Sequence, residues 1–257
     1  MSDVLIIGDG TLAEEMAALV GEAGYESAAY LYSVDEDEAI SGLENYLEEF
    51  PGPYNLIIES IVGDRDEKRQ ALKMVGRHKR PGALILTAAH NASATEIGAW
   101  QGVGAAEIVG WAALPPIGNV VEVMAGLRTN PDSLAGARRF LEALDREPVI
   151  INDTVGGVLP RIVASLVNGA AFALMEGAAT AEDIDKGMKL GTNYPYGPLE
   201  WADKIGLDQI VGILDALGKV HGSDRYRVCP LLRQLVLARH FGERTGRGFY
   251  TYGRAGS

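Results

Sequence analysis

The fold is decided near the amino terminus by the stretch Val4-Leu5-Ile6-Ile7-Gly8-Asp9-Gly10-Thr11-Leu12-Ala13. Four consecutive apolar residues are typical of a strand that is buried on both faces of a parallel sheet. The two glycines then permit a tight turn, and the pattern of a helix runs from Thr11 to Ala23. A strand, a G-x-G-x-x-A turn and a helix in this order form the fingerprint of a Rossmann-type dinucleotide-binding domain.

The turn predicts a site for the pyrophosphate of a dinucleotide at Gly8, Asp9, Gly10, Thr11 and Leu12. The first backbone N–H groups of a helix, together with its dipole, attract a phosphate. Asp9 opposes this attraction, because two unit charges ~4 Å apart repel by about 4 kcal/mol at an effective dielectric of 20. The repulsion is relieved if the Asp9 side chain points outward into solvent.

A second feature weakens the dinucleotide site. In this fold an acid about 20 residues after the turn usually binds the adenosine ribose. Here that count ends at Leu31 and Tyr32, and the nearest acid is Asp35. A lost hydrogen bond to a charged acceptor is worth roughly 1.5–3 kcal/mol. We therefore expect NAD to bind weakly.

The alternation of strand and helix patterns continues to about Asn152. Further strands are predicted at Ser27–Tyr32, Asn55–Ile61, Leu84–Thr87, Val109–Ala112 and Val120–Met124. Helices are predicted at Asp35–Glu49, Arg65–His78 and Asp132–Leu144. This alternation implies an α/β fold, a doubly wound parallel sheet with helices on both faces. We assign residues 1–152 to this domain.

The pattern changes after Asn152. A stretch that is apolar on nearly every side runs from Pro160 to about Gly177, and helix patterns follow at Leu207–Val220 and Pro230–His240. A helix of this kind is buried from several directions, either in a helical core or in a dimer interface. Residues 153–257 are therefore expected to form an all-helical domain.

The composition excludes several classes of protein. A net charge of −12 argues against nucleic acid and anionic lipid as partners, because no field draws the protein to them. The single cysteine, Cys229, excludes an intrachain disulfide and a multi-thiolate metal site, and no other cluster has metal-ligand spacing. The amino terminus lacks a signal-peptide pattern, and no apolar run approaches the ~18 residues of a membrane span. We expect a cytoplasmic protein without a metal.

Four motifs occur in order in the second half of the chain: Glu182–Gly191, Tyr194–Glu200, Asp203–Asp208 and Phe241–Tyr250. Together they resemble the carboxy-terminal domain of the 3-hydroxyacyl-CoA (3-hydroxybutyryl-CoA) dehydrogenases. The resemblance implies that residues 153–257 form a helical dimerisation and substrate domain. It also implies that the protein is a homodimeric oxidoreductase of fatty acid metabolism. Such an enzyme transfers hydride between NAD and a 3-hydroxyacyl thioester of coenzyme A.

Parts of the first half are similar to the same family. Leu56–Val62, followed by Lys68, is similar to the strand and helix start that flank the nicotinamide, so the resemblance places Lys68 at the cofactor. Gly63 stands where the family usually has a second acid. The run His90-Asn91-Ala92-Ser93 resembles a turn in which a serine hydroxyl helps to bind substrate, which implies this role for Ser93.

The catalytic positions differ from the family pattern. In the family, a histidine in a His-Phe-Phe-Asn-Pro run accepts the hydroxyl proton, and a glutamate orients this histidine. The corresponding run here is Trp111-Ala112-Ala113-Leu114-Pro115, so Trp111 takes the place of the base, whereas Glu122 keeps the glutamate position. Pro160 stands where an asparagine should bind the substrate carbonyl. Indole has no basic lone pair and proline has no side-chain donor, so the chain resembles a divergent member without the usual catalytic histidine.

Two further features have alternative interpretations. A stripe of basic residues at helical spacing could receive the phosphates of coenzyme A, but a solvated helix face is favoured. The stripe consists of Arg65, Lys68, Arg69, Lys73, Arg77 and Arg80.

His90 follows the strand Leu84–Thr87 at the carboxyl edge of the sheet, where doubly wound folds bind ligands. It is the histidine placed to act as a substitute base, although a polar surface loop is the favoured interpretation.

Three functions remain open on this basis. The resemblance favours an NAD-linked oxidoreductase of the 3-hydroxyacyl-CoA class with an altered or impaired active site. A non-catalytic dimeric relative that kept the fold as a binding or scaffolding subunit is the first alternative. An enzyme of another reaction class that uses the same cleft is the second.

Overall fold

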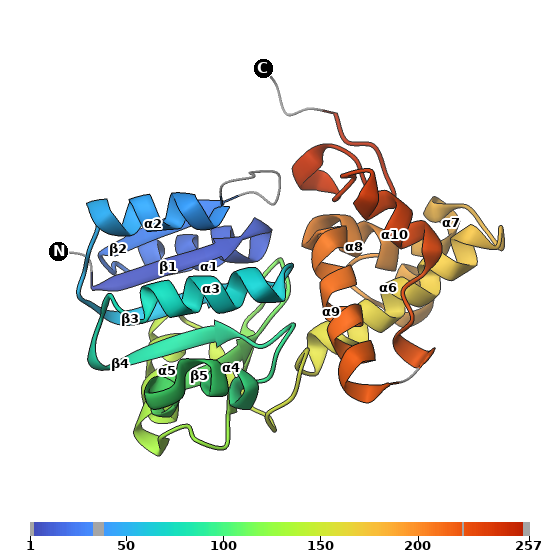
Figure 1. The fold of residues 1–257 in the computed structure, drawn as a ribbon. Coiled ribbons are helices and arrows are strands. Elements are labelled where there is room, and N and C mark those ends of the chain that lie inside the picture. Colours follow the sequence, from blue (N-terminus) through green and yellow to red (C-terminus); the bar gives the residue numbers. More distant parts are fainter. Residues whose placement is uncertain (1–2, 33–38, 223, 254–257) are drawn as a thin grey trace. The chain divides into compact units, whose positions relative to one another are not determined.

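A computed structural model describes residues 3–32, 39–222 and 224–253 (Figure 1). The chain divides into two compact units, Met1–Val158 and Leu159–Ser257. The boundary expected near residue 152 falls in the segment that joins the last strand of the first unit to the first helix of the second.

Within its described residues, the first unit is built on one sheet of seven strands in the order β2-β1-β3-β4-β5-β6-β7. Neighbouring strands are parallel except β5 and β6, which are antiparallel. The prediction of a doubly wound Rossmann-type sheet is confirmed, with one departure from a wholly parallel arrangement. A parallel crossover needs a dozen or more residues, and the segment between β5 and β6 is too short for one. The strands are β1 (Val4–Asp9), β2 (Ser27–Tyr32), β3 (Tyr54–Ser60), β4 (Lys79–Ala88), β5 (Ile108–Ala112), β6 (Val120–Ala125) and β7 (Glu147–Ile150).

Helices cover both faces of this sheet (Figure 1). Side chains of α2 (Ala39–Glu49), α3 (Arg65–Val75) and α4 (Ala94–Gln101) join a single cluster with residues of the strands. On the other face, α1 (Gly10–Glu22) and α5 (Pro131–Ala143) pack against the strands. The first four residues of the predicted helix Asp35–Glu49 lie outside the described residues.

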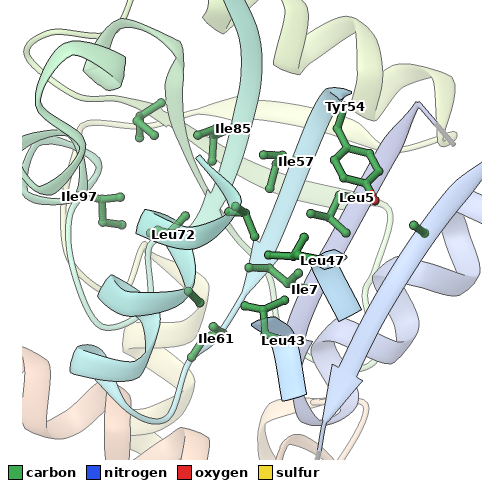
Figure 2. Close-up of a cluster of buried hydrophobic side chains, with 14 of the residues drawn as sticks. Leu5, Ile7, Leu43, Leu47, Tyr54, Ile57, Ile61, Leu72, Ile85 and Ile97 are labelled. Atoms are coloured by element: carbon green, nitrogen blue, oxygen red, sulfur yellow. The ribbon is translucent and has the colours of Figure 1, made fainter. Parts of the chain in front are cut away.

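The register of the strands explains the core of the first unit (Figure 2). Leu5 pairs with Ile57, Ile57 with Ile85, and Ile85 with Ile108, so one apolar row crosses four strands. None of these side chains is exposed. Burial of each stabilises the fold by roughly 1.5–3 kcal/mol relative to its exposure. Most of the polar residues described below lie at or just beyond the carboxyl ends of these strands and of β2.

The second unit is helical, as the sequence predicts. Its helices are α6 (Leu159–Met175), α7 (Ala181–Thr192), α8 (Pro198–Ile205), α9 (Leu207–His221) and α10 (Pro230–Leu237). In the described part of this unit, β-structure is limited to two isolated bridges, Gly242–Arg247 and Arg247–Thr251. Helix α6 is buried along one face against α8 and α9, but Ile162 is 55% exposed. Helix α6 is therefore packed on one side within one chain and leaves part of its apolar surface exposed, which keeps open the alternative of a dimer interface.

Two buried carboxylates of the second unit have structural roles. Asp185 accepts hydrogen bonds from the backbone N–H groups of Leu199 and Glu200, both at 2.8 Å, at the start of α8. Asp203 accepts hydrogen bonds from the N–H groups of Phe249 and Tyr250, both at 2.9 Å. The motifs that carry the family resemblance are thus places where a carboxylate satisfies a turn or a helix start.

Candidate active site at the carboxyl edge of the sheet

The site begins at the glycine turn between β1 and α1. A Cβ atom on Gly8 would lie 2.6 Å from the Cβ of Ala13 and 2.9 Å from that of Ser60, so only glycine permits this packing of strand and helix. Gly10 has a φ of 66°, in the left-handed region that favours glycine. The first turn of α1 carries no acid. This geometry fits a pyrophosphate, because the first N–H groups of a helix and its dipole favour a negative charge.

Asp9 lies inside this turn with only 1% of its surface exposed. Its carboxylate accepts hydrogen bonds from the N–H groups of Val62, at 3.0 Å, and Gly63, at 3.3 Å. The alternative in which Asp9 points outward into solvent is therefore wrong. Strand β1 lies between β2 and β3 at the point where the strand order reverses, so Asp9 bridges the loops where this fold binds its ligand.

Tyr32 occupies the end of β2, where the ribose acid was sought. The side chain is 6% exposed, and its hydroxyl is buried without a hydrogen-bond partner. Burial raises the pKa of Tyr32 well above its ordinary value, and the carboxylates of Asp9 and Glu67 raise it further. Asp35, the nearest acid in sequence, lies outside the described residues. Among the described residues, tyrosine rather than an acid therefore ends this strand.

Lys68 is completely buried and is surrounded by oxygen atoms. Its Nζ lies 2.8 Å from Oε2 of Glu59, and donates to the carbonyl oxygens of Ile61, at 3.1 Å, and Ala88, at 2.6 Å. Glu59 also accepts a hydrogen bond from the hydroxyl of Thr87. Burial lowers the pKa of Lys68, and Glu59 opposes this shift. The ammonium group joins the ends of β3 and β4, so the solvated-face interpretation is wrong for Lys68.

The burial of Lys68 follows from its place in α3. Asp64 caps this helix through the N–H groups of Asp66 and Glu67, so α3 begins directly after the turn that ends β3. Position 68 then shares the sheet-facing side of the helix with Ala71, Leu72 and Val75, which are also buried. Contact of Lys68 with a cofactor stays a prediction, since all of its described hydrogen bonds are internal.

His90 is buried at the end of β4, with 1% of its surface exposed. The interpretation as a polar surface loop is therefore wrong. Its Nε2 lies 2.7 Å from the carbonyl oxygen of Ala113, and its Nδ1 is buried without a partner. Burial lowers the pKa of His90 to about 4, Lys68 adds to this shift, and the bond to Ala113 opposes it. The ring also packs edge-on against Trp111, with 6.4 Å between centroids.

Asn91 and Ser93 follow in the same turn. The amide nitrogen of Asn91 donates to the carbonyl oxygen of Val62 at 2.9 Å, whereas its amide oxygen is buried without a partner. Ser93 caps α4, and its hydroxyl accepts a hydrogen bond from the N–H of Glu96 at 3.2 Å. The substrate-binding role of Ser93 stays a prediction. Asn91 was missed by the sequence reasoning, which gave it no role of its own.

Glu122 lies on β6, directly opposite Ala112 of β5. Its Oε2 accepts a hydrogen bond from the N–H of Val158 at 2.6 Å. Trp111 pairs with Val123 and does not face Glu122, because successive side chains of a strand point to opposite faces. Trp111 is fully buried, and its Nε1 donates to the carbonyl oxygen of Glu59 at 3.3 Å. The partner position of Glu122 is therefore Ala112, whereas the motif alignment placed Trp111 there.

Buried polar atoms without a partner gather at this edge of the sheet. Of the eight such atoms among the described residues, four lie at or just beyond the ends of β2, β3 and β4. Native proteins leave few buried polar groups unsatisfied, so a concentration of them indicates a place that a polar ligand completes. The four atoms are the Tyr32 hydroxyl, the Ser60 hydroxyl, Nδ1 of His90 and the amide oxygen of Asn91.

Comparisons with known proteins agree with this architecture. Residues 156–252 match the carboxy-terminal domain of 3-hydroxyacyl-CoA dehydrogenase, and residues 38–154 match its NAD-binding domain. A probable 3-hydroxybutyryl-CoA dehydrogenase of Bacillus subtilis is 34% identical over 200 residues, which are 77% of this chain and 69% of that protein. The chain belongs to the 3-hydroxyacyl-CoA dehydrogenase family. The match to the NAD-binding domain supports NAD as the cofactor.

Two further relatives support the family assignment and the fold. The 3-hydroxybutyryl-CoA dehydrogenase of Clostridioides difficile is 31% identical over 202 residues, covering 78% of this chain and 72% of that protein. The crystal structure of (S)-3-hydroxybutyryl-CoA dehydrogenase from Ralstonia eutropha has a TM-score of 0.73 at 25% identity, and the similarity covers 99% of this chain and 100% of that one. The glycine turn lies outside the residues that match the NAD-binding domain, since that match begins at residue 38.

Within the described residues, no helix is long and apolar enough to cross a membrane. No group of three His, Cys, Asp or Glu side chains in the described parts of the chain could hold a metal ion.

Proposed function

We propose that the protein is an NAD-dependent oxidoreductase that transfers hydride between the nicotinamide and the 3-position of a 3-hydroxyacyl thioester of coenzyme A. Curated relatives carry this activity in their names. The single observation that supports it most is the group of unmatched buried polar atoms beside the glycine turn. A scaffold without a ligand gains nothing from leaving four buried polar atoms unsatisfied at one edge, since each costs about 1–3 kcal/mol.

Bound NAD supplies the acceptor for the hydride of the 3-hydroxyl carbon. The N–H groups of Thr11 and Leu12 are proposed to bind the pyrophosphate, with Gly8 and Gly10 allowing its close approach. Asp9 adds a negative charge at this place and weakens the binding. Tyr32, in place of an acid, weakens the hold on the adenosine ribose.

The same geometry predicts slow turnover. Oxidation of a hydroxyl group requires a base within hydrogen-bond reach of its proton. Ala112, the residue opposite Glu122, has no basic side chain. Glu122 therefore has no histidine to orient at this position. General-base catalysis contributes about 10²- to 10⁴-fold, and we expect turnover to be lower by that order. His90, with Ser93, is proposed as the substitute that handles the hydroxyl proton.

We also propose a homodimer held by the helices of the second unit, as the family resemblance implies. Ile162 and Met175, at the two ends of α6, are 55% and 43% exposed, and a long apolar helix face of this kind is usually covered by a partner. Light scattering should show a dimer, and Ile162→Lys should shift it toward a monomer. Val120→Lys, a matched change at a 46% exposed valine of β6, should leave the dimer intact. A wild type that stays monomeric at micromolar concentration contradicts this assembly.

A cytoplasmic location is also part of the proposal.

The activity is tested by following the loss of NADH absorbance with acetoacetyl-CoA as the second substrate. Slow turnover above the buffer rate is expected. His90→Gln should lower it further, because glutamine lacks the basic nitrogen that is proposed to handle the hydroxyl proton. A wild-type rate equal to that of buffer, at saturating concentrations of both substrates, contradicts the proposed activity.

A further inference from the structure

The hydrogen bond between His90 and Ala113 fixes the tautomer of the histidine. Nε2 lies 2.7 Å from a backbone carbonyl oxygen, which can only accept, so Nε2 carries the hydrogen and donates it. A neutral imidazole has one N–H group, which leaves Nδ1 with a free lone pair. The ring is neutral near pH 7, since burial lowers its pKa to about 4. His90 therefore presents an acceptor, not a donor, on its second nitrogen.

Asn91, the next residue in the chain, also has a buried hydrogen-bond acceptor without a partner. Asn91 uses its amide nitrogen as a donor to the carbonyl oxygen of Val62, at 2.9 Å. Its amide oxygen and Nδ1 of His90 are both buried and without a partner. Both are acceptors, so a group that completes either of them must carry an O–H or N–H hydrogen. A carbonyl or phosphate oxygen placed against them would meet only lone pairs.

The backbone around His90 holds this arrangement in place. The N–H of Ala89 donates to the carbonyl oxygen of Trp111 at 2.8 Å, and the carbonyl oxygen of Ala89 accepts from the N–H of Gly156 at 2.7 Å. A flip of the imidazole ring would bring a carbon atom to the carbonyl oxygen of Ala113 and lose the bond. The acceptor on Nδ1 is thus oriented before any ligand arrives, as recognition of a particular donor requires.

We propose that His90, together with Asn91, recognises a hydrogen-bond donor of the bound ligand, either the 3-hydroxyl of the substrate or an O–H or N–H group of the cofactor. This inference rests on the proposed function and adds to it a direction of recognition. If the donor is the substrate hydroxyl, the site favours the hydroxyacyl form over the ketoacyl form, because the ketone offers Nδ1 no hydrogen. An unmatched acceptor costs about 1–3 kcal/mol, so we expect a preference of roughly tenfold or more.

Nitrogen NMR of histidine-labelled protein tests this directly, without relying on turnover. The free protein should show one buried imidazole with a protonated Nε2 and an unbonded Nδ1, and this signal should be absent from His90→Gln. NADH alone, 3-hydroxybutyryl-CoA alone and acetoacetyl-CoA alone are then added to separate samples. We expect the Nδ1 resonance to move in the direction of an accepted hydrogen bond with NADH or with the hydroxyacyl thioester. The sample that shows the shift identifies the source of the donor, and acetoacetyl-CoA should leave the resonance unchanged.

Two variants of His90 separate recognition from structure. Glutamine can place an amide nitrogen near the position of Nε2, which keeps the bond to Ala113 but removes the acceptor at Nδ1. Asparagine can place its amide oxygen near Nδ1, which keeps the acceptor but loses that bond. We expect His90→Gln to bind the identified ligand about tenfold more weakly at an unchanged melting temperature, as one unmatched hydrogen bond implies. His90→Asn should retain more of the affinity despite a lower melting temperature.

The outcomes distinguish this inference from the proposed function. Binding of NADH or the thioesters with an unmoved Nδ1 resonance overturns the inference and leaves the oxidoreductase proposal standing. An Nδ1 that already accepts a hydrogen bond in the free protein, and does not change with any ligand, overturns it as well. If none of the three ligands binds, the proposed function and the inference are both overturned.

Discussion

Ala112 and Glu122 lie directly opposite each other in the antiparallel pairing of β5 and β6. Gly157 packs over both, and a Cβ atom there would overlap the carboxylate of Glu122 and lie 2.9 Å from the Cβ of Ala112. Glu122 is therefore held by the backbone at Gly157 and Val158, next to a methyl group instead of an imidazole. The position at which a base could be restored is Ala112.

Ala112→His should raise the turnover of acetoacetyl-CoA with NADH by at least tenfold, because the imidazole would lie beside Glu122 and supply part of the 10²- to 10⁴-fold of general-base catalysis. Ala112→Asn is the matched control, with a polar side chain but no basic nitrogen. A crowded core makes a lower melting temperature the expected cost for both variants. Equal rates for the two variants would show that no base acts from this position.

Trp111→His combined with Pro160→Asn is the pair of changes that motif alignment alone suggests. We expect this double variant to remain as slow as the wild type, because Trp111 is buried on the face opposite to Glu122 and donates to the backbone of Glu59. The same NADH assay measures it. Restored turnover in this double variant would show that the register of β5 does not decide the catalytic position.

Asp9→Asn should tighten the binding of NADH by about tenfold or more, because a charge beside the expected pyrophosphate is removed while the shape of the side chain is kept. Asp9→Ala should also tighten it, although this change leaves the N–H groups of Val62 and Gly63 without their acceptor. Glu14→Gln, an equal change of charge at an exposed position of α1, is the control. An unchanged or weaker dissociation constant for both Asp9 variants would refute the electrostatic argument.

Lys68→Met should lower the free energy of unfolding by about 3–5 kcal/mol, because the carboxylate of Glu59 is then buried without its cation. Adding Glu59→Gln should recover part of this loss, since the unpaired charge is removed. Lys73→Met, at an exposed position of the same helix, should change the stability by less than about 0.5 kcal/mol. Urea denaturation measures all three variants. A double variant less stable than Lys68→Met would mean that the pair does not act as a charged unit.

The titration of His90 predicts a pH dependence of stability. The pKa is about 6.5 in an unfolded chain and about 4 in the folded protein, so the unfolded chain binds more protons between these values. The free energy of unfolding is therefore highest above pH 6.5, and it decreases by about 3 kcal/mol as the pH falls toward 4. His90→Gln should flatten the dependence of the urea midpoint on pH over this window. An equal dependence in the wild type and in His90→Gln would contradict the assignment to His90.

The hydropathy pattern predicts most of the fold, because most strands of the first unit are apolar runs and most of its helices are amphipathic. Strand β7 and helix α4 of that unit were missed for physical reasons. Strand β7 (Glu147–Ile150) is short, largely exposed and contains a proline, so it resembles a loop. Helix α4 (Ala94–Gln101) is brief and rich in small residues, and its pattern is weak. The antiparallel direction of β6 depends on the length of a connection, which hydropathy does not report.

The site is less predictable than the fold, because burial and register are tertiary properties. His90 stands in a polar run, and only the fold shows that β4 carries it into the interior. A shift of one residue along β5 exchanges Trp111 for Ala112 beside Glu122, and a run without a histidine gives no means to choose between them. One signal for the Glu59–Lys68 pair was available: an acid inside an apolar strand precedes a lysine on the sheet-facing side of the next helix.

Calorimetric titration with NADH and NADPH tests the central claim most directly, because the proposed hydride transfer depends on a bound dinucleotide. The account predicts saturable binding of NADH in the micromolar range, tightened by Asp9→Asn. NADPH should bind more weakly, because the carboxylates of Asp9 and Glu67 near Tyr32 repel its additional phosphate. Absence of binding of either nucleotide, to the wild type and to Asp9→Asn, would contradict the account and favour a relative that kept the fold without the chemistry.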